Sequence, residues 1–261
     1  MTGPVLLPVR FQPPRIAPVP RGLFAATTWT DAEPGDPIRW LAEGVEFDLM
    51  NYGGDEAFGV WGADWCAAPD DLTGDDVKEG TRADGLDPFP AMTVWAFDAC
   101  DLTAPSRTEV RDRAERVLRL REQSAVERQV AARLIADAGT PVGVTDIVAA
   151  VGALDTALTD TGTVGMIHAP AMLAASAADR SLIVRDGSVL RTPLGHRWVF
   201  GTGYSDVLED TLVATSPTFG WRNPTAVREA IKVEWNLAVA IAERSFVVGY
   251  EAALGAATIT P

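Results

Sequence analysis

Apolar residues recur at helical spacing over one long stretch, SRTEVRDRAERVLRLREQSAVERQVAARLIADAG, residues 106–139. This spacing predicts a single long helix over 106–138 with one face in the protein core. Ser106 and Glu109 have the pattern of a capping box at its start, and Gly139 with Pro141 provides a stop. The buried stripe is expected to contain Val110, Ala114, Val117, Leu118, Val126, Val130 and Leu134.

The remaining positions of this helix alternate in charge. About 32 residues at a rise of 1.5 Å each give roughly 48 Å, which is long for one compact unit of this chain. Because acids alternate with bases, we interpret the face as solvated and not as a nucleic-acid surface. Three pairs with the acid first are expected at i,i+4 spacing: Glu109–Arg113, Asp112–Arg116 and Glu115–Arg119.

Shorter patterns on both sides predict a mixture of strands and helices. Residues 91–100 read as a strand, 145–160 as a helix capped by Thr145, 162–170 as a strand, and 170–181 as a short helix with Pro170 in its first turn. RDGS predicts a hairpin turn and TPLG a β-turn. Beyond residue 211 the pattern is mostly β, with a strongly apolar strand at Phe246–Tyr250 and another at the end, while 226–236 fits either a helix or a strand.

Two segments lack regular periodicity. Residues 1–40 are interrupted by eight prolines, yet they carry many apolar residues, among them Leu6, Leu7, Phe11, Ile16 and Val19. Such an arm lies either on a neighbouring subunit or on its own domain. Residues 41–90 are rich in glycine and aspartate, and their polar, acidic part is longer than an ordinary connection, which indicates a functional extension.

Composition narrows the class of protein. The chain has 261 residues, 47% of them hydrophobic, and a net charge of −14, which argues against sequence-independent binding of nucleic acid. Twenty Arg outnumber two Lys, Lys78 and Lys232. Cys66 and Cys100 form no paired motif, so neither a disulfide framework nor a zinc cluster is indicated. We expect no signal peptide and no membrane span, and therefore synthesis in the cytoplasm.

The stretch RTPLGHRWVFGTGY, residues 191–204, contains one of the two histidines beside a pair of glycines. Its glycines, Gly201 and Gly203, lack the third glycine of a dinucleotide fingerprint, and we interpret them as a bend at a strand end. His196 and His168 fall on separate predicted strands and are expected to be structural. The acidic pairs at 70–71 and 75–76 lack the ligand spacing of a calcium loop. No catalytic, cofactor-binding or metal residue is therefore assigned, and no cofactor is expected.

The order of these parts resembles the major capsid proteins of tailed bacteriophages, in the shell fold named after phage Hong Kong 97, and most of all those of actinobacteriophages. The similar stretches are FPAMTVWAFDACD, GTVGMIHAP, RTPLGHRWVFGTGYSD and AERSFVVGYEAALGAATI. The resemblance implies an α+β fold. Its parts would be an N-terminal arm (1–40), an extended β-hairpin loop (41–90), a peripheral domain (91–141) with a spine helix (106–138), an axial domain (142–220) and peripheral return strands (221–261).

The resemblance also implies a function. Copies would assemble as hexamers and pentamers into an icosahedral virion shell, made in the host cytoplasm, that encloses DNA without binding it specifically. Scaffolding, portal or decoration proteins would be further partners. The alternatives are an encapsulin-like nanocompartment shell, a minor capsid or tail protein and, from a different class, a small oligomeric hydrolase using His168 or His196. Some members cross-link a loop lysine to a peripheral asparagine. Lys78, Asn223 and Asn236 have suitable places, but no supporting acid can be assigned.

Overall fold

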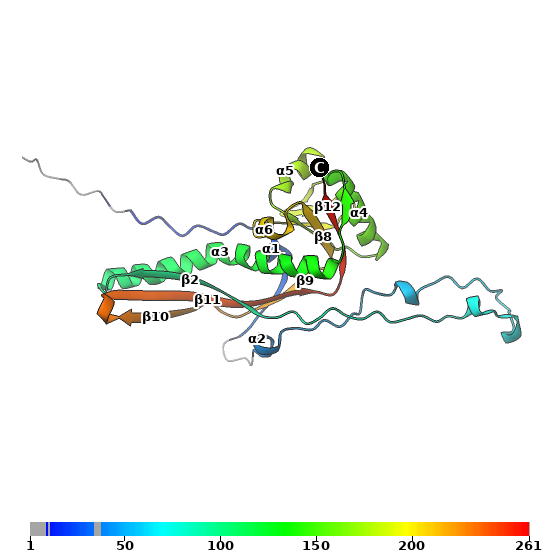
Figure 1. Ribbon diagram of the computed structural model, residues 1–261, viewed down its shortest axis with the longest axis horizontal. Coiled ribbons are helices and arrows are strands. Elements are labelled where there is room, and N and C mark those ends of the chain that lie inside the picture. Colours follow the sequence, from blue (N-terminus) through cyan, green and yellow to red (C-terminus); the bar gives the residue numbers. More distant parts are fainter. Residues whose placement is uncertain (1–8, 10, 34–37, 261) are drawn as a thin grey trace, which may run out of the picture.

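The computed structural model describes residues 9, 11–33 and 38–260, and shows an elongated body with two long projections (Figure 1). The arm residues expected at 1–8 and 34–37 lie outside this range. One sheet has five strands: β1 (Thr28–Asp31), β9 (Thr218–Arg222), β11 (Leu237–Tyr250), β10 (Ala226–Lys232) and β2 (Met92–Cys100). The other has seven, in the order β3 (Val142–Val144), β12 (Ala253–Ile259), β8 (Thr211–Thr215), β4 (Met166–Pro170), β7 (Arg197–Gly201), β6 (Val189–Arg191) and β5 (Val184–Asp186).

Helices cover both sheets. The long helix α3 (Ala104–Ala138) runs along the five-stranded sheet, and α4 (Ile147–Asp160) and α5 (Leu173–Asp179) lie at the seven-stranded sheet (Figure 1). Three shorter helices are α1 (Leu23–Ala26), α2 (Arg39–Glu43) and α6 (Ser205–Leu208). No helix in the described part of the chain is both long and apolar enough to cross a membrane.

The predicted long helix is present, but its start and one stripe position were wrong. The helix begins two residues early, at Ala104, with Pro105 in its first turn, so Ser106 is not the cap. Thr103 precedes it and donates a hydrogen bond to Asp101 (2.7 Å). Val117 points outward and is 45% exposed, whereas Leu118 is 1% exposed. The other predicted stripe residues are buried, and the helix ends at Gly139, whose φ of 69° favours glycine.

Of the three predicted ion pairs, Glu109–Arg113 forms, at 3.8 Å. The other two do not form among the described residues, because their partners contact the N-terminal arm. Arg116 donates to the carbonyl of Pro13 (2.9 Å), and Glu115 pairs with Arg15 (3.3 Å).

Several local predictions are confirmed and some need correction. The strand at 91–100, the RDGS hairpin and the TPLG turn are present. Asp146, not Thr145, caps α4, by accepting the N–H of Ala149 (2.9 Å). Pro170 ends β4 and does not start a helix. The ambiguous stretch 226–236 is β10 followed by a short 3-10 turn, Val233–Trp235.

The last strand does not lie in the same sheet as the strand before it, although residues 221–261 were expected to return together to the peripheral domain. β11 belongs to the five-stranded sheet, but the chain then crosses over, and β12 pairs with β8 and β3 in the seven-stranded sheet. Both strands are apolar, so hydrophobicity alone could not assign them to different sheets.

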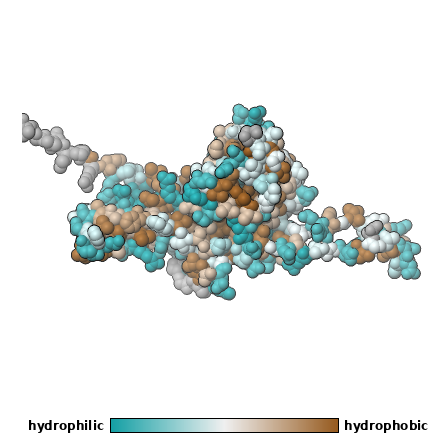
Figure 2. All heavy atoms as spheres, in the orientation of Figure 1, coloured by the Kyte–Doolittle hydropathy of each residue, from teal (hydrophilic) through white to brown (hydrophobic). Residues whose placement is uncertain are grey.

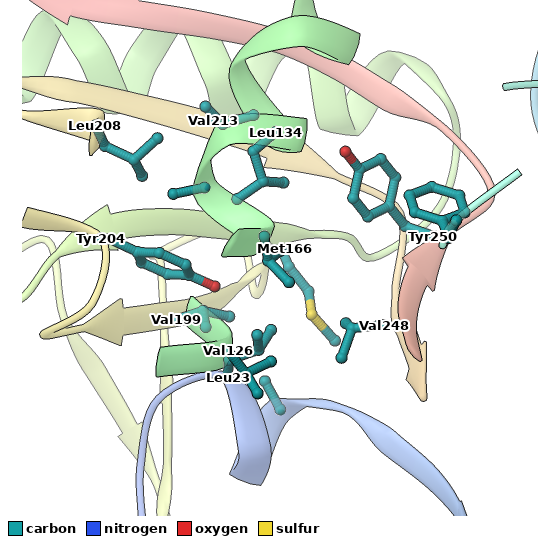
Figure 3. Packing of buried hydrophobic residues seen from close by; sticks show 14 of the residues in the cluster. Leu23, Val126, Leu134, Met166, Val199, Tyr204, Leu208, Val213, Val248 and Tyr250 are labelled. Carbon is teal, nitrogen blue, oxygen red and sulfur yellow. The ribbon is translucent and has the colours of Figure 1, made fainter. Parts of the chain in front are cut away.

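The central core joins the two sheets through the C-terminal half of α3. The side chains labelled in Figure 3 come from α1, α3, α6 and four strands, and they point into one shared space. A second cluster lies between α4 and the seven-stranded sheet, and a third under the N-terminal half of α3. In the first cluster α3 packs against strands of both sheets, and in the third it packs against the five-stranded sheet alone. The helix therefore connects the two halves of the body.

The observed register of α3 predicts a contrast between adjacent residues. Leu118→Ala should lower the free energy of unfolding by about 2–5 kcal/mol, because it leaves a cavity in the core. Val117→Ala should change it by less than about 0.5 kcal/mol, because that side chain is largely solvated. Urea unfolding of the two variants measures both values. Equal losses would contradict the register.

Candidate assembly surfaces

The N-terminal arm lies along α3 and is bound through its backbone. Side chains of the helix donate hydrogen bonds to arm carbonyls: Arg116 to Pro13 (2.9 Å), Arg119 to Ile16, and Gln123 to Arg21 (2.7 Å). Arg15 adds ion pairs to Glu115 and Asp112 at 3.3 and 3.7 Å. In the described residues the arm therefore packs on its own subunit, which was one of the two expected arrangements.

The apolar side chains at residues 9 and 11–20 of this arm remain in solvent. Phe11 is 80% exposed, and Ile16 and Val19 are exposed to a similar degree. A backbone held in place with unburied apolar side chains is suited to contact another molecule. The arm can therefore lie on its own domain and also contact a neighbouring subunit. Its polar backbone faces α3, and the apolar side chains of its outer part are free for a partner.

The root of the arm is held by Glu127, a fully buried carboxylate on α3. It accepts the N–H groups of Leu23 (3.1 Å) and Gly203 (3.0 Å) and the side-chain amide of Gln123 (3.0 Å). Burial raises the pKa of Glu127 above its ordinary value, while these hydrogen bonds oppose the rise. One side chain therefore joins the arm, α3 and the loop after β7.

Close packing against Glu127 explains the glycines of GTGY. A Cβ at Gly203 would lie 2.1 Å from the carbonyl oxygen of Ser124, and one at Gly201 would lie 2.7 Å from the Glu127 carboxyl carbon. Neither glycine has a positive φ. The chain bends at this strand end, as expected. In addition, α3 packs so closely against Gly201 and Gly203 that there is no space for a side chain at either position.

The second projection is the loop between α2 and β2, which extends far from the body (Figure 1). Its two runs are joined at the base by an isolated β-bridge between Val45 and Phe89, and farther out by a hydrogen bond from Thr81 to Glu56 (3.2 Å). Three 3-10 turns lie along it: Asp55–Ala57, Pro69–Asp71 and Gly74–Asp76. The loop is extended as expected, but its described residues form no regular β-ladder.

This loop exposes large apolar side chains among its acids (Figure 2). Trp65 is 91% exposed, and Phe58 and Val60 are exposed to a similar degree. Lys78 places its ammonium 4.3 Å from the ring centre of Trp61. Exposed aromatic residues on a thin projection have little chance of burial within the same chain, so they mark a second contact surface.

The root of the loop is held by a second carboxylate, Glu251, at the turn between β11 and β12. It accepts the backbone N–H groups of Met50 and Asn51, and the Asn51 amide at 2.8 Å. Burial raises the pKa of Glu251, but the hydrogen bonds outweigh burial and hold the pKa below its ordinary value. Nearby, the hydroxyls of Tyr52 and Thr163 lie 3.0 Å apart.

Both histidines are buried and bound by structural partners. The Nδ1 of His168 lies 2.9 Å from the hydroxyl of Tyr204, and its Nε2 lies 2.9 Å from that of Thr215. The Nδ1 of His196 accepts the N–H of Gly165 (3.3 Å), and its Nε2 lies 3.2 Å from the Thr159 hydroxyl. Burial lowers the pKa of His168 to about 3, and it also lowers the pKa of His196. The two rings share none of these hydrogen-bond partners, and each is held in a separate structural setting.

The remaining candidate residues of the sequence lie on different elements. Asn223 accepts the N–H of Ser245 (2.7 Å), and Asn236 adopts a left-handed conformation after the 3-10 turn that follows β10. Cys66 is exposed on the loop, and Cys100 ends β2. Asp71 and Asp76 accept backbone N–H groups of Ala68 and Thr73, while the side chain of Asp75 lies outside the described part. Within that part, no three His, Cys, Asp or Glu residues gather as metal ligands do.

The two-sheet body with its long helix is an arrangement found in solved structures of other proteins. The sequence matches no protein-family model and no curated protein. Among solved structures, the chain is similar to one from Microbacterium phage Oxtober96, with a TM-score of 0.57 and 12% identity over 100% of this chain and 96% of that one. It is also similar to the virus-like particle from Pyrococcus furiosus, with a TM-score of 0.51 and 7% identity over 92% of each chain. The chain therefore has the Hong Kong 97-like fold, and the predicted α+β class is confirmed.

A structural role for His168 predicts a pH effect on stability. Its pKa is about 3 in the folded state and ordinarily 6.5, so below pH 6.5 the unfolded chain binds a proton that the folded chain does not. Stability from this group is complete above pH 6.5 and falls towards pH 3, by up to about 1.4 kcal/mol per pH unit. His168→Gln should be less stable than wild type at neutral pH, and the difference should shrink as the pH falls.

Urea unfolding at about pH 7 and about pH 4.5 measures this difference. Thr215→Val is the matched control, because it removes a hydrogen bond to the same ring and leaves the titrating group in place. A stability difference for His168→Gln that stays constant with pH would contradict the buried, uncharged histidine.

Proposed function

We propose that this protein is a structural virion protein, the major capsid subunit of a tailed bacteriophage, and not an enzyme. Copies assemble as hexamers and pentamers into an icosahedral shell around the phage DNA. The observation that carries the proposal is a Hong Kong 97-like body with two projections that are fixed at their roots and expose apolar side chains.

The arrangement of polar and apolar groups supports assembly as the function. A free subunit with exposed aromatic residues on both projections is unfavourable in water, and neighbouring subunits relieve this cost by burying them. The five-stranded sheet with α3 acts as the peripheral part, and the seven-stranded sheet as the axial part. Scaffolding, portal and decoration proteins are further partners that we propose.

The acidic balance suits a container for DNA. A net charge of −14 gives a wall that does not retain the nucleic acid passing it, since retention requires cationic groups that release counterions. A nanocompartment shell is the second candidate, favoured by the likeness to the Pyrococcus furiosus particle. Neighbouring genes distinguish the two: terminase, portal and protease genes accompany a capsid gene, and a cargo enzyme gene accompanies a nanocompartment.

Electron microscopy of the purified protein tests assembly directly. We expect closed shells of uniform diameter, because a rigid subunit with fixed contact surfaces closes with a defined symmetry. A chain that stays monomeric or dimeric at all salt concentrations and with all partner proteins would contradict the proposal.

Shortening of the arm should impair assembly and leave folding intact. Deletion of residues 1–20 should leave unfolding almost unchanged, because the lost side chains that the structure describes, at residues 9 and 11–20, are exposed, but should lower shell yield by at least about tenfold. Deletion of residues 1–30 should unfold the subunit, because it removes the fully buried Leu23 and most of β1. Thermal unfolding and micrographs measure the two effects. Normal shell yield after the shorter deletion would contradict the role of the arm.

A further inference from the structure

A continuous series of buried polar groups begins at the root of the arm. The carboxylate of Glu127 accepts the N–H of Gly203, and the next residue along the chain is Tyr204. The hydroxyl of Tyr204 lies 2.9 Å from Nδ1 of His168, and Nε2 of His168 lies 2.9 Å from the hydroxyl of Thr215. These four side chains are fully buried, so water does not compete for their hydrogen bonds.

The direction of each hydrogen bond around His168 is fixed. The Thr215 hydroxyl donates its only proton to the carbonyl oxygen of Ser216 (2.8 Å), so it accepts a proton from Nε2 of His168. Burial lowers the pKa of His168 to about 3, and the ring is therefore uncharged at neutral pH, with its one proton on Nε2. Nδ1 then accepts the proton of the Tyr204 hydroxyl. With the ring proton on Nδ1, the Thr215 hydroxyl would have to turn away from Ser216, so only one arrangement satisfies every group.

Ser216 continues the series to the turn that holds the extended loop. Its Oγ accepts the N–H groups of Glu251 (2.9 Å) and Ala252 (3.1 Å), and its own N–H binds the carbonyl of Ala252 (2.9 Å). Glu251 is the carboxylate that accepts the N–H groups of Met50 and Asn51 at the root of the loop. Hydrogen bonds and peptide units therefore connect one root to the other without a break.

Apolar side chains surround the middle of the series, so its members have no alternative partners. Tyr204 lies in the central core with Met166 and Val199, and its hydroxyl points into this core (Figure 3). A polar group that loses its partner there stays unpaired, which is unfavourable. The ring of His168 also packs edge-on against Tyr204, with 5.7 Å between the ring centres. Displacement of one member therefore disturbs the next, and the series responds as a unit.

We infer that this buried series, with His168 at its centre, couples the root of the arm to the root of the loop within one subunit. Release of the loop from Glu251 lets the turn at Ser216 move. This movement weakens the hydrogen bonds on both sides of His168 and loosens the N–H of Gly203 from Glu127. Because a coupling free energy is reciprocal, release of the arm loosens the loop root by the same factor. The inference goes beyond the proposed function, since it concerns a single subunit and holds whether or not shells form.

Hydrogen exchange of backbone amides in the full chain tests the coupling. Glu251→Gln removes the charge that holds the loop, so the amides of Met50 and Asn51 should exchange faster. The amides of Leu23 and Gly203, at the root of the arm, should also exchange at least about fivefold faster. Asn51→Ala removes only an exposed side chain that binds Glu251, and it should change the same amides in the same direction without a risk to folding.

Tyr204→Phe interrupts the series and keeps the aromatic ring in the core. In this background Glu251→Gln should still loosen the amides of Met50 and Asn51, but should change exchange at Leu23 by less than about twofold. The comparison is a double-mutant cycle, so the effect of Tyr204→Phe by itself cancels.

Thr211→Val is the matched control. It removes a hydroxyl pair with Thr258 (2.7 Å) that joins β8 and β12 outside the series. Exchange at Leu23 and Gly203 should stay within about twofold of wild type in this control. The amide of Leu118, under the N-terminal half of α3, should keep its wild-type exchange in all variants, because it lies outside the coupled region.

Three results would each overturn the inference. The first is unchanged exchange at Leu23 and Gly203 in both variants of the loop root. The second is an equal response of Leu23 to Glu251→Gln when Tyr204→Phe is present. The third is a control in which Leu23 exchanges as fast as it does in the Glu251→Gln chain, which would indicate general destabilisation.

Discussion

The architecture depends on a buried carboxylate that has no ion-pair partner in the described part of the chain. Glu127 reaches its surroundings through N–H donors of the arm, of the loop after β7 and of its own helix. An ionised group without these donors would be too costly in the core, so the three elements must converge wherever the carboxylate is charged. The glycines at 201 and 203 follow from the same convergence, because a side chain there would occupy the space of α3.

Glu251 plays the corresponding part for the other projection, at the point where the chain passes from one sheet to the other. Both projections therefore leave the body from carboxylates that accept backbone N–H groups. These contacts fix the direction of the roots and use no apolar side chain of the projections. Apolar side chains farther out, such as Phe11 on the arm and Trp65 on the loop, are exposed and take no part in the core. They are available to the neighbouring copies of the assembly that we propose.

Periodicity predicted the elements better than their connections. The buried stripe of α3 could be predicted because six of its seven residues follow the helical repeat and are buried. Val117 was predicted wrongly because it lies at the edge of that stripe. Glu122 and Glu127 were not foreseen, since acids on an arginine-rich helix suggest a solvated face. The partner Leu23 lies 104 positions away from Glu127, and no local pattern reports such a contact. The extended loop was identified from its composition. Composition did not reveal that its described residues form no β-ladder, because glycine and aspartate indicate turns and do not specify strand pairing.

The attachment of the arm has an evolutionary consequence. Arg116, Arg119 and Gln123 bind carbonyl oxygens, which every residue type supplies. Along the outer arm, residues 11–21, these contacts therefore do not depend on the side chains that the arm carries, and Arg15 adds ion pairs of its own. Mutations in the arm can alter the partner-facing side chains while the tether persists. In the assembly that we propose, the specificity of the contact between copies can then diverge between lineages without a change in the fold of the subunit.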